Sequence, residues 1–225
     1  MQMTISPSLL AANFACLGDE LEDIKRGGAD MLHLDIMDGH FVPNISFGMP
    51  VLAALRKVSD LFFDVHIMIS KPMRYLEALR ASGADLITFH CEAEGDPIDT
   101  INAIHAMGCK AGISLSPDTP VEQVLPYIGG VDLVLIMTVV PGFGGQKFRA
   151  DMMPKVARIA EYARELGRDD LMIQVDGGIT RDTIALCAEN GANSFVAGSA
   201  VFGSGDYKAE IAALRSIAES REEMS

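Results

Sequence analysis

The amino-acid sequence predicts an α/β fold built as one (β/α)8 barrel over residues 1–225. Eight apolar, β-rich runs alternate with eight amphipathic segments, and no linker or low-complexity run divides the chain. A doubly wound sheet would place a glycine fingerprint after its first strand, where this chain has Ala11-Ala12-Asn13. Since 49% of the 225 residues are hydrophobic, one domain can bury a sufficient core without disulfides.

The expected strands are short apolar runs with strong β character. They occupy residues 3–8, 31–36, 62–67, 85–90, 110–115, 132–137, 171–175 and 194–197. The segments between them carry apolar residues at three- and four-residue spacing, as in Leu17, Leu21 and Ile24, which predicts helices with one buried face. These helices are expected near residues 14–26, 49–58, 72–82, 98–107, 121–127, 151–166, 181–190 and 208–218.

Glycines mark the boundaries between several of these helices and the strands that follow. Gly28, Gly83 and Gly191 each stand two residues before an Asp or Asn at a strand start, and Gly130 stands in a close variant of the pattern. A glycine can take the left-handed conformation that ends a helix. The pattern therefore predicts a helix end, a tight turn and entry into a buried strand.

Composition excludes several classes of function. The net charge of −13 argues against nucleic-acid binding, which depends on clustered Lys and Arg. The sequence lacks a run of about 18 apolar residues that could span a membrane, and its start lacks the features of a signal peptide. The four cysteines are scattered without a CxxC pair, which favours reduced thiols. We therefore expect a soluble, cytoplasmic protein that meets an anionic ligand with backbone amides.

Polar side chains occur inside strands where a barrel core should be apolar. In the second run, His33, Asp35 and Met37 share one face, while the opposite face is aliphatic and should pack against helices. His66 repeats this arrangement in the third run, and Asp176 ends the seventh. An unpaired carboxylate inside a barrel would be very costly. We therefore predict that these two histidines and two aspartates form a metal site.

The ligand types suit Zn²⁺, Fe²⁺, Mn²⁺ or Co²⁺ and do not choose among them, although we favour Zn²⁺ or Fe²⁺. The alternative is that each is a separately satisfied polar residue of the core. No such role is expected for His40, His90 and His105, which are placed in a loop, at a strand end and on a helix surface.

Three methionines also fall where a substrate should lie. Met37, Met68 and Met137 are at or near the ends of the second, third and sixth strands. Methionine commonly fills gaps in a core. The functional interpretation is a proton-inert lining that keeps water away from a carbanion-like intermediate.

Glycine-rich segments follow the last three strands. These segments comprise Gly142, Phe143, Gly144 and Gly145 after the sixth strand, Gly177 and Gly178 after the seventh, and Gly198 with Ser199 after the eighth. Barrels often bind phosphate with the loops after strands 7 and 8, and glycine lets backbone amides approach an oxyanion. We expect an anion site there, with the first segment acting as a lid.

These motifs together resemble the ribulose-phosphate 3-epimerase family over essentially the whole chain. The matching segments are Ser6-Pro7-Ser8-Leu9-Leu10, HLDIMDGHFVPNISFG (33–48), DVHIMI (64–69), MTVVPGFGGQKF (137–148), VDGGI (175–179) and AGSAVFG (197–203). Val140 stands where the family commonly has a polar residue. The resemblance implies a TIM barrel of the ribulose-phosphate-binding type, one divalent metal, a homo-oligomer, and interconversion of D-ribulose 5-phosphate and D-xylulose 5-phosphate.

The resemblance also implies roles for individual residues. His33, Asp35, His66 and Asp176 match the metal ligands, and the two aspartates match the acid and base on opposite faces of the substrate. Ser8 and His66 match substrate contacts. The remaining matches to the substrate and phosphate loops are Gly142, Phe143, Gly144, Gly145, Gly177, Gly178, Gly198 and Ser199.

The chemistry of the residues agrees with this resemblance. Removal of a proton next to a carbonyl needs stabilisation of the enediolate, which a metal can supply, and inversion needs an acid and a base on opposite faces. Three alternatives remain open: epimerisation of a related phosphoketose such as D-allulose 6-phosphate, a metal-independent isomerase or decarboxylase, and a non-catalytic barrel that binds sugar phosphates.

Overall fold

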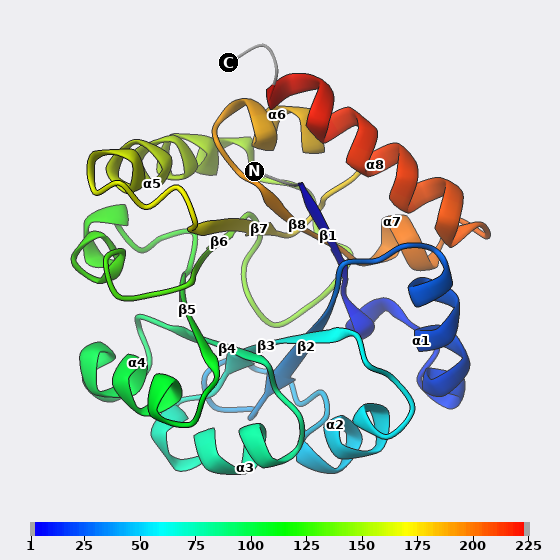
Figure 1. Ribbon diagram of the computed structural model, residues 1–225, viewed down its shortest axis with the longest axis horizontal. Coiled ribbons are helices and arrows are strands. Elements are labelled where there is room, and N and C mark those ends of the chain that lie inside the picture. Colours follow the sequence, from blue (N-terminus) through cyan, green and yellow to red (C-terminus); the bar gives the residue numbers. More distant parts are fainter. Residues whose placement is uncertain (1–2, 223–225) are drawn as a thin grey trace.

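The computed structural model describes residues 3–222, which form a (β/α)8 barrel (Figure 1). All adjacent strand pairs are parallel, and the strands follow the order β1-β8-β7-β6-β5-β4-β3-β2. A parallel bridge between Ser8 and His33 joins the first and second strands and closes the barrel. The strands are β1 Thr4–Pro7, β2 Met31–Met37, β3 Phe62–Met68, β4 Leu86–His90, β5 Lys110–Leu115, β6 Leu133–Met137, β7 Met172–Asp176 and β8 Ser194–Ala197.

Helices surround the strands in Figure 1. The α-helices are α1 Leu17–Arg26, α2 Met49–Arg56, α3 Leu76–Ala81, α4 Pro97–Ala106, α5 Met153–Glu165, α6 Ile184–Glu189, α7 Ser199–Phe202 and α8 Tyr207–Glu222. Short 3-10 helices are η1 Leu9–Ala11, η2 Phe14–Cys16, η3 Pro72–Arg74, η4 Val121–Gln123, η5 Leu125–Tyr127 and η6 Ala150–Met152. Each predicted strand is therefore present, and the predicted fold class is confirmed.

The apolar core has an outer layer and an inner layer. On β2, Leu32, Leu34 and Ile36 belong to the large cluster between the sheet and the helices. A second cluster around Leu133 and Leu135 fills the barrel interior. This is the division that strand alternation predicts, since successive side chains point to opposite faces.

Strand register places the polar residues of neighbouring strands beside one another. Asp35 on β2 pairs with His66 on β3. Met137 on β6 pairs with Asp176 on β7. Because side chains at paired positions of parallel strands share a face, each pair points into the same end of the barrel.

Two helical segments differ from the sequence prediction. Residues 121–127 form η4 and η5 rather than one helix, because Pro126 has no amide N–H for an α-helical bond and its ring disfavours the preceding turn. The helix α7 was not predicted, since its four residues are too few to show an amphipathic period.

Three of the four boundary glycines behave as expected. Gly28, Gly83 and Gly191 have φ values of 87°, 111° and 97°. Gly130 is not among the described glycines with positive φ, so the prediction of a left-handed turn there was wrong. It follows two 3-10 helices rather than an α-helix, and its amide bonds to the carbonyl of Tyr127.

Candidate active site and metal centre

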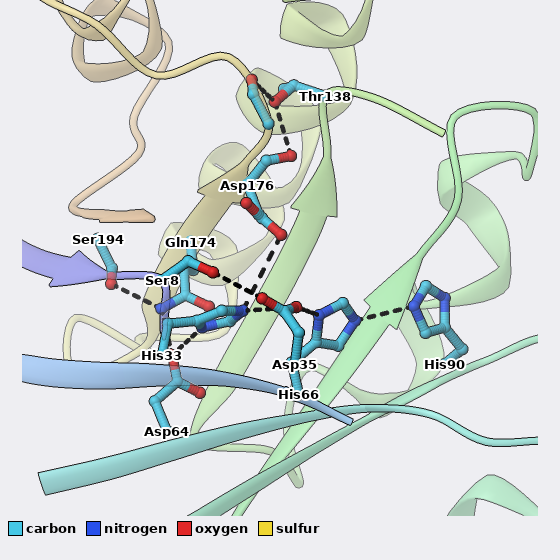
Figure 2. A network of polar contacts seen from close by, with 11 residues as sticks. Ser8, His33, Asp35, Asp64, His66, His90, Thr138, Gln174, Asp176 and Ser194 are labelled. Carbon is cyan, nitrogen blue, oxygen red and sulfur yellow. Dashed lines mark hydrogen bonds and ion pairs between the residues drawn. The ribbon is translucent and has the colours of Figure 1, made fainter. Parts of the chain in front are cut away.

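A cluster of four polar residues lies at the carboxyl ends of β2, β3 and β7. One ligand atom from each of His33, Asp35, His66 and Asp176 lies within 4.8 Å of the others. The predicted ligands are therefore brought together, and Figure 2 shows Asp35 between His33 and His66, with Asp176 approaching from the other side. Within residues 3–222, Nε2 of His33 is buried without a hydrogen-bond partner and lies 3.4 Å from Oδ1 of Asp35 and 3.9 Å from Oδ2 of Asp176.

Nδ1 of each histidine in the cluster lies beside a carboxylate oxygen. Nδ1 of His33 lies 2.8 Å from the buried Asp64 carboxylate, which also accepts a 2.7 Å bond from the amide of Gln174. Nδ1 of His66 lies 3.0 Å from Oδ1 of Asp35. Two histidine nitrogens and two carboxylates consequently face one point, an arrangement that suits a divalent transition metal.

The two aspartates have opposite shifts in pKa. Burial alone would raise the pKa of Asp35, but His33 and then His66 outweigh burial and hold it well below its ordinary value. The pKa of Asp176 is raised to about 7, first by burial and then by the negative charge of Asp35. Near neutral pH the metal-free site therefore holds Asp35 ionised, while Asp176 is poised to exchange a proton.

The pKa of His33 is also displaced. Burial alone would lower it, but the carboxylates of Asp64 and Asp35 outweigh burial and hold the pKa well above its ordinary value. A cation bound beside Nε2 would take the place of that proton, because a metal-bound imidazole is neutral.

A cavity of about 620 Å³, part of it open to solvent, lies over the cluster. Asp35 and Asp176 reach its lining, whereas His33 and His66 are fully buried beneath it. His66 was also expected to contact the substrate, and in the structure it does not line this cavity. A cavity at the carboxyl ends of barrel strands, lined by two convergent carboxylates, is a typical binding site for a small molecule.

The predicted lining residues surround the cavity. Besides the aspartates, the site residues that line it are Ser8, Met37, Met68, Met137, Gly142, Phe143, Gly144, Gly145, Gly177, Gly178, Gly198 and Ser199. Among the described residues that line it, none is Lys or Arg. An anionic group in the cavity would therefore depend on backbone amides and hydroxyls.

Two glycines bring the backbone of the β7 loop close to neighbouring loops. Gly177 and Gly178 have φ values of 123° and 67°, which L side chains rarely adopt. A Cβ atom on Gly178 would lie 2.7 Å from the backbone nitrogen of Phe148. Only glycine fits there without a shift of the chain.

The loop after β6 covers the cavity. Its residues 139–146 line the cavity, and in Figure 1 this loop crosses the centre of the barrel. The Gln146 amide donates to the carbonyls of Val140 and Phe143 at 2.6 and 2.8 Å, and Asn44 donates to the carbonyl of Gly142 at 2.8 Å. These bonds hold the loop over the aspartates.

Two residues that contact the cluster were missed from the sequence. His90 was expected to be separate from the site, but its Nε2 lies 2.9 Å from Nε2 of His66 (Figure 2). Asp64, which was not singled out, contacts His33. Asp64 is in phase with His66 on β3, and strand alternation could have indicated that it points inward.

Comparisons with known proteins agree over almost the whole chain. The model of the ribulose-phosphate 3 epimerase family matches residues 4–202. Ribulose-phosphate 3-epimerase of Bacillus subtilis is 48% identical over 211 residues, covering 94% of this chain and 97% of the relative. The cytoplasmic isoform of ribulose-phosphate 3-epimerase from rice, Oryza sativa, is 45% identical over 225 residues, covering 98% and 96%.

Solved structures of lower identity share the fold. A structure of KGPDC from Streptococcus mutans has a TM-score of 0.70 at 14% identity, with 98% of this chain and 99% of that chain covered. A structure of 3-hexulose-6-phosphate synthase has a TM-score of 0.67 at 20% identity, with 96% and 99% covered.

Within residues 3–222, no helix is both long and apolar enough to cross a membrane.

The family match, the identity to named relatives and the His/Asp cluster at the carboxyl ends of the barrel strands all indicate the same family. The chain belongs to the ribulose-phosphate 3-epimerase family, whose members are isomerases.

Proposed function

We propose that the protein interconverts D-ribulose 5-phosphate and D-xylulose 5-phosphate by moving protons at C3, with Asp35 and Asp176 as the two catalytic residues. The names of the relatives support this substrate pair. The observation that carries the proposal is the pair of carboxylates from β2 and β7, which line one cavity with opposite shifts in pKa. Inversion at carbon requires such a pair, a base on one face and an acid on the other.

In the direction from ribulose 5-phosphate, the ionised Asp35 takes the proton from C3. The bonding electrons of that C–H bond move between C2 and C3, and the carbonyl oxygen takes up negative charge as the enediolate forms. Asp176 then gives its proton to the opposite face of C3, so that the configuration inverts and no atom is lost. In the reverse direction the two aspartates exchange roles.

The residues present fit one divalent cation held by His33, Asp35, His66 and Asp176. The buried Nε2 of His33 has no hydrogen-bond partner within residues 3–222, and a cation would give that atom a partner. When bound, the ion would supply positive charge that stabilises the oxygens of the enediolate. Zn²⁺ and Fe²⁺ are the ions we favour, with Mn²⁺ and Co²⁺ as alternatives.

The phosphate group is expected at the end of the cavity formed by Gly177, Gly178, Gly198 and Ser199. Two observations favour their backbone amides as the groups that bind the phosphate. No Lys or Arg is among the described residues that line the cavity, and the protein carries a net charge of −13. Backbone amides and glycine permit the close approach that an oxyanion needs.

The methionine lining suits the same reaction. Met37, Met68 and Met137 are all at most 4% exposed, and each borders the cavity. Their side chains cannot donate a proton to the carbanion-like intermediate, and they exclude water from its surroundings. With the loop after β6 closed, protonation is left to the aspartates.

The test is an assay of purified protein on D-ribulose 5-phosphate before and after chelator treatment, with single ions added back. We expect turnover to xylulose 5-phosphate, its loss on metal removal and its return with a divalent cation. D-allulose 6-phosphate is assayed in parallel. Turnover of the hexulose alone would contradict the proposed substrate, and full activity in completely metal-free protein would contradict the proposed metal.

A further inference from the structure

His90 is a buried residue to which the proposed reaction gives no task. It ends β4 and is 1% exposed, directly behind the metal cluster. Its Nε2 lies 2.9 Å from Nε2 of His66, its Nδ1 lies 3.1 Å from Oε2 of Glu92, and its ring packs on Phe41 with centroids 4.7 Å apart. We refer to His66, His90 and Glu92 as the His66–His90–Glu92 triad.

The triad determines which nitrogen of His66 is available to a cation. Nδ1 of His66 faces Asp35 in the cluster, whereas Nε2 faces His90 and points away from it. A neutral imidazole that binds a cation through Nδ1 carries its proton on Nε2. That proton must then be donated to Nε2 of His90, which acts as the acceptor.

The proton on Nε2 of His66 also determines where the proton of His90 lies and how His90 contacts Glu92. If Nε2 of His90 accepts, its proton is on Nδ1, and Nδ1 donates to the carboxylate of Glu92. One arrangement of protons therefore satisfies both contacts. The opposite tautomer of His66 would place a proton on Nδ1 and block the ligand position.

Glu92 is itself held in place by the loop after β5. Its Oε1 accepts a 2.7 Å bond from the backbone amide of Ser116 and a bond from the hydroxyl of Thr119. Nζ of Lys155 on α5 donates to the carbonyls of Pro117 and Thr119, at 2.6 Å each. The carboxylate is thus anchored on two sides, which gives the triad a fixed end.

We propose that His90 and Glu92 are positioning residues that hold His66 in the tautomer and orientation needed to bind the divalent cation. The carboxylate of Glu92, acting through His90, also makes Nδ1 of His66 a stronger donor to the cation. On the other side of the cluster, Asp64 occupies the corresponding place behind His33. This inference rests on the proposed ligand set.

Outer hydrogen-bond partners of this kind typically change metal affinity by about 10–100-fold. His90→Phe keeps a ring but removes the acceptor for the proton of His66. His90→Gln restores an acceptor, because the carbonyl oxygen of glutamine can lie near the place of Nε2. Glu92→Gln keeps the shape of Glu92 and removes its charge.

The experiment measures the dissociation constant of Co²⁺ alone by competition with a chelator, and records the absorption spectrum of the bound ion, without substrate. We expect His90→Phe to weaken binding by about 10–100-fold and to alter the spectrum. We expect a smaller loss for Glu92→Gln, and an affinity close to that of the unaltered protein for His90→Gln. Circular dichroism and the Tm of the metal-free variants show whether each is folded.

His105→Phe is the matched control. His105 also pairs with a carboxylate, that of Asp132 at 2.9 Å. However, its side chain is half-exposed, and this ion pair does not involve the four proposed metal ligands. It should bind Co²⁺ like the unaltered protein. Unchanged affinity in folded His90→Phe would overturn the inference, as would equal losses in His90→Phe and His90→Gln.

If His90→Phe does not fold, Glu92→Gln decides the question, and unchanged affinity in that variant overturns the inference. His66→Ala in the same titration tests the proposed ligand set separately from the His66–His90–Glu92 triad. Loss of binding in His66→Ala with no change in the His90 and Glu92 variants would reject the triad and leave the ligand set intact. No loss in His66→Ala would reject the ligand set and the triad together.

Discussion

The hydroxyl of Ser8 donates a 2.7 Å hydrogen bond to Oδ2 of Asp35, across the bridge that closes the barrel between β1 and β2. Oδ1 of the same carboxylate faces His66 at 3.0 Å. The two oxygens of Asp35 therefore face residues from different segments of the chain, and rotation of the carboxylate would break the hydrogen bond from Ser8. A base that removes a proton from one face of a substrate needs such a fixed direction.

Replacement of Ser8 by alanine should reduce kcat by about 10–150-fold, because a hydrogen bond to a charged group contributes about 1.5–3 kcal/mol. Ser6→Ala is the control. Ser6 lies on β1, two residues before Ser8, and is also buried, but its hydroxyl has no hydrogen-bond partner in the described part of the chain. Steady-state kinetics of both variants should show a loss only in Ser8→Ala, and equal kcat values in the two would contradict this role of Ser8.

Asp176→Asn should lower kcat by at least about 10³-fold, since an amide cannot exchange the proton that inversion requires. The far-ultraviolet spectrum should be unchanged, because the side chain lies at the end of β7 and remains partly exposed to the cavity. Asp170→Asn, which alters a surface ion pair with Arg168, should retain activity. Normal turnover in Asp176→Asn would refute the assignment.

Gly178→Ala should both destabilise the protein and weaken phosphate binding. Alanine at a φ of 67° with a Cβ 2.7 Å from Phe148 is strained, and strain of this kind costs about 1–3 kcal/mol. Gly18→Ala on α1 meets no atom within 4 Å and puts a better helix former in the helix, so it should leave phosphate inhibition unchanged and should not lower the stability. Urea unfolding and inhibition by inorganic phosphate measure the two effects, and a Gly178→Ala protein of full stability would show that the loop tolerates a side chain.

The lowered pKa of Glu92 should make the stability of the folded protein depend on pH. Burial would raise its pKa, but hydrogen bonds from His90, Thr119 and the amide of Ser116 outweigh burial and lower the pKa to about 2, from an ordinary value of 4.5. Between these values the unfolded chain binds a proton that the folded protein does not. The stabilisation is thus complete above pH 4.5 and is lost as the pH falls towards 2.

Glu92→Gln removes this contribution. The difference in free energy of unfolding between the unaltered protein and Glu92→Gln should be on the order of 1–2 kcal/mol above pH 5, after allowance for solvent screening, and should shrink towards pH 2. Urea titrations of the metal-free proteins across this range provide the measurement. A difference that stays constant with pH would show that the carboxylate of Glu92 titrates normally.

The fold and the four clustered residues could be predicted because both depend on local periodicity. His33 and Asp35 share a strand face with Met37, and that alternation directs them into the barrel. What could not be predicted depends on contacts between strands distant in sequence. His90 reads as an ordinary strand end, and only its position behind His66 in the folded barrel reveals its role.

The short helical elements also could not be predicted from the sequence. The four residues of α7 and the 3-10 turns of residues 121–127 are too short to show a helical period. The homo-oligomeric state, the cytoplasmic location and the extent of the domain over residues 1–225 stay predictions.

In the proposed mechanism two different residues handle the proton at C3, and the isotope content of the product reports on this. Ribulose 5-phosphate is converted in D₂O, and xylulose 5-phosphate from the first turnovers is examined by NMR at C3. Because Asp35 removes a proton from one face and Asp176 delivers one that has exchanged with solvent, the product should carry deuterium at C3 from the start. Product that retains the original hydrogen at C3 would contradict the two-aspartate mechanism.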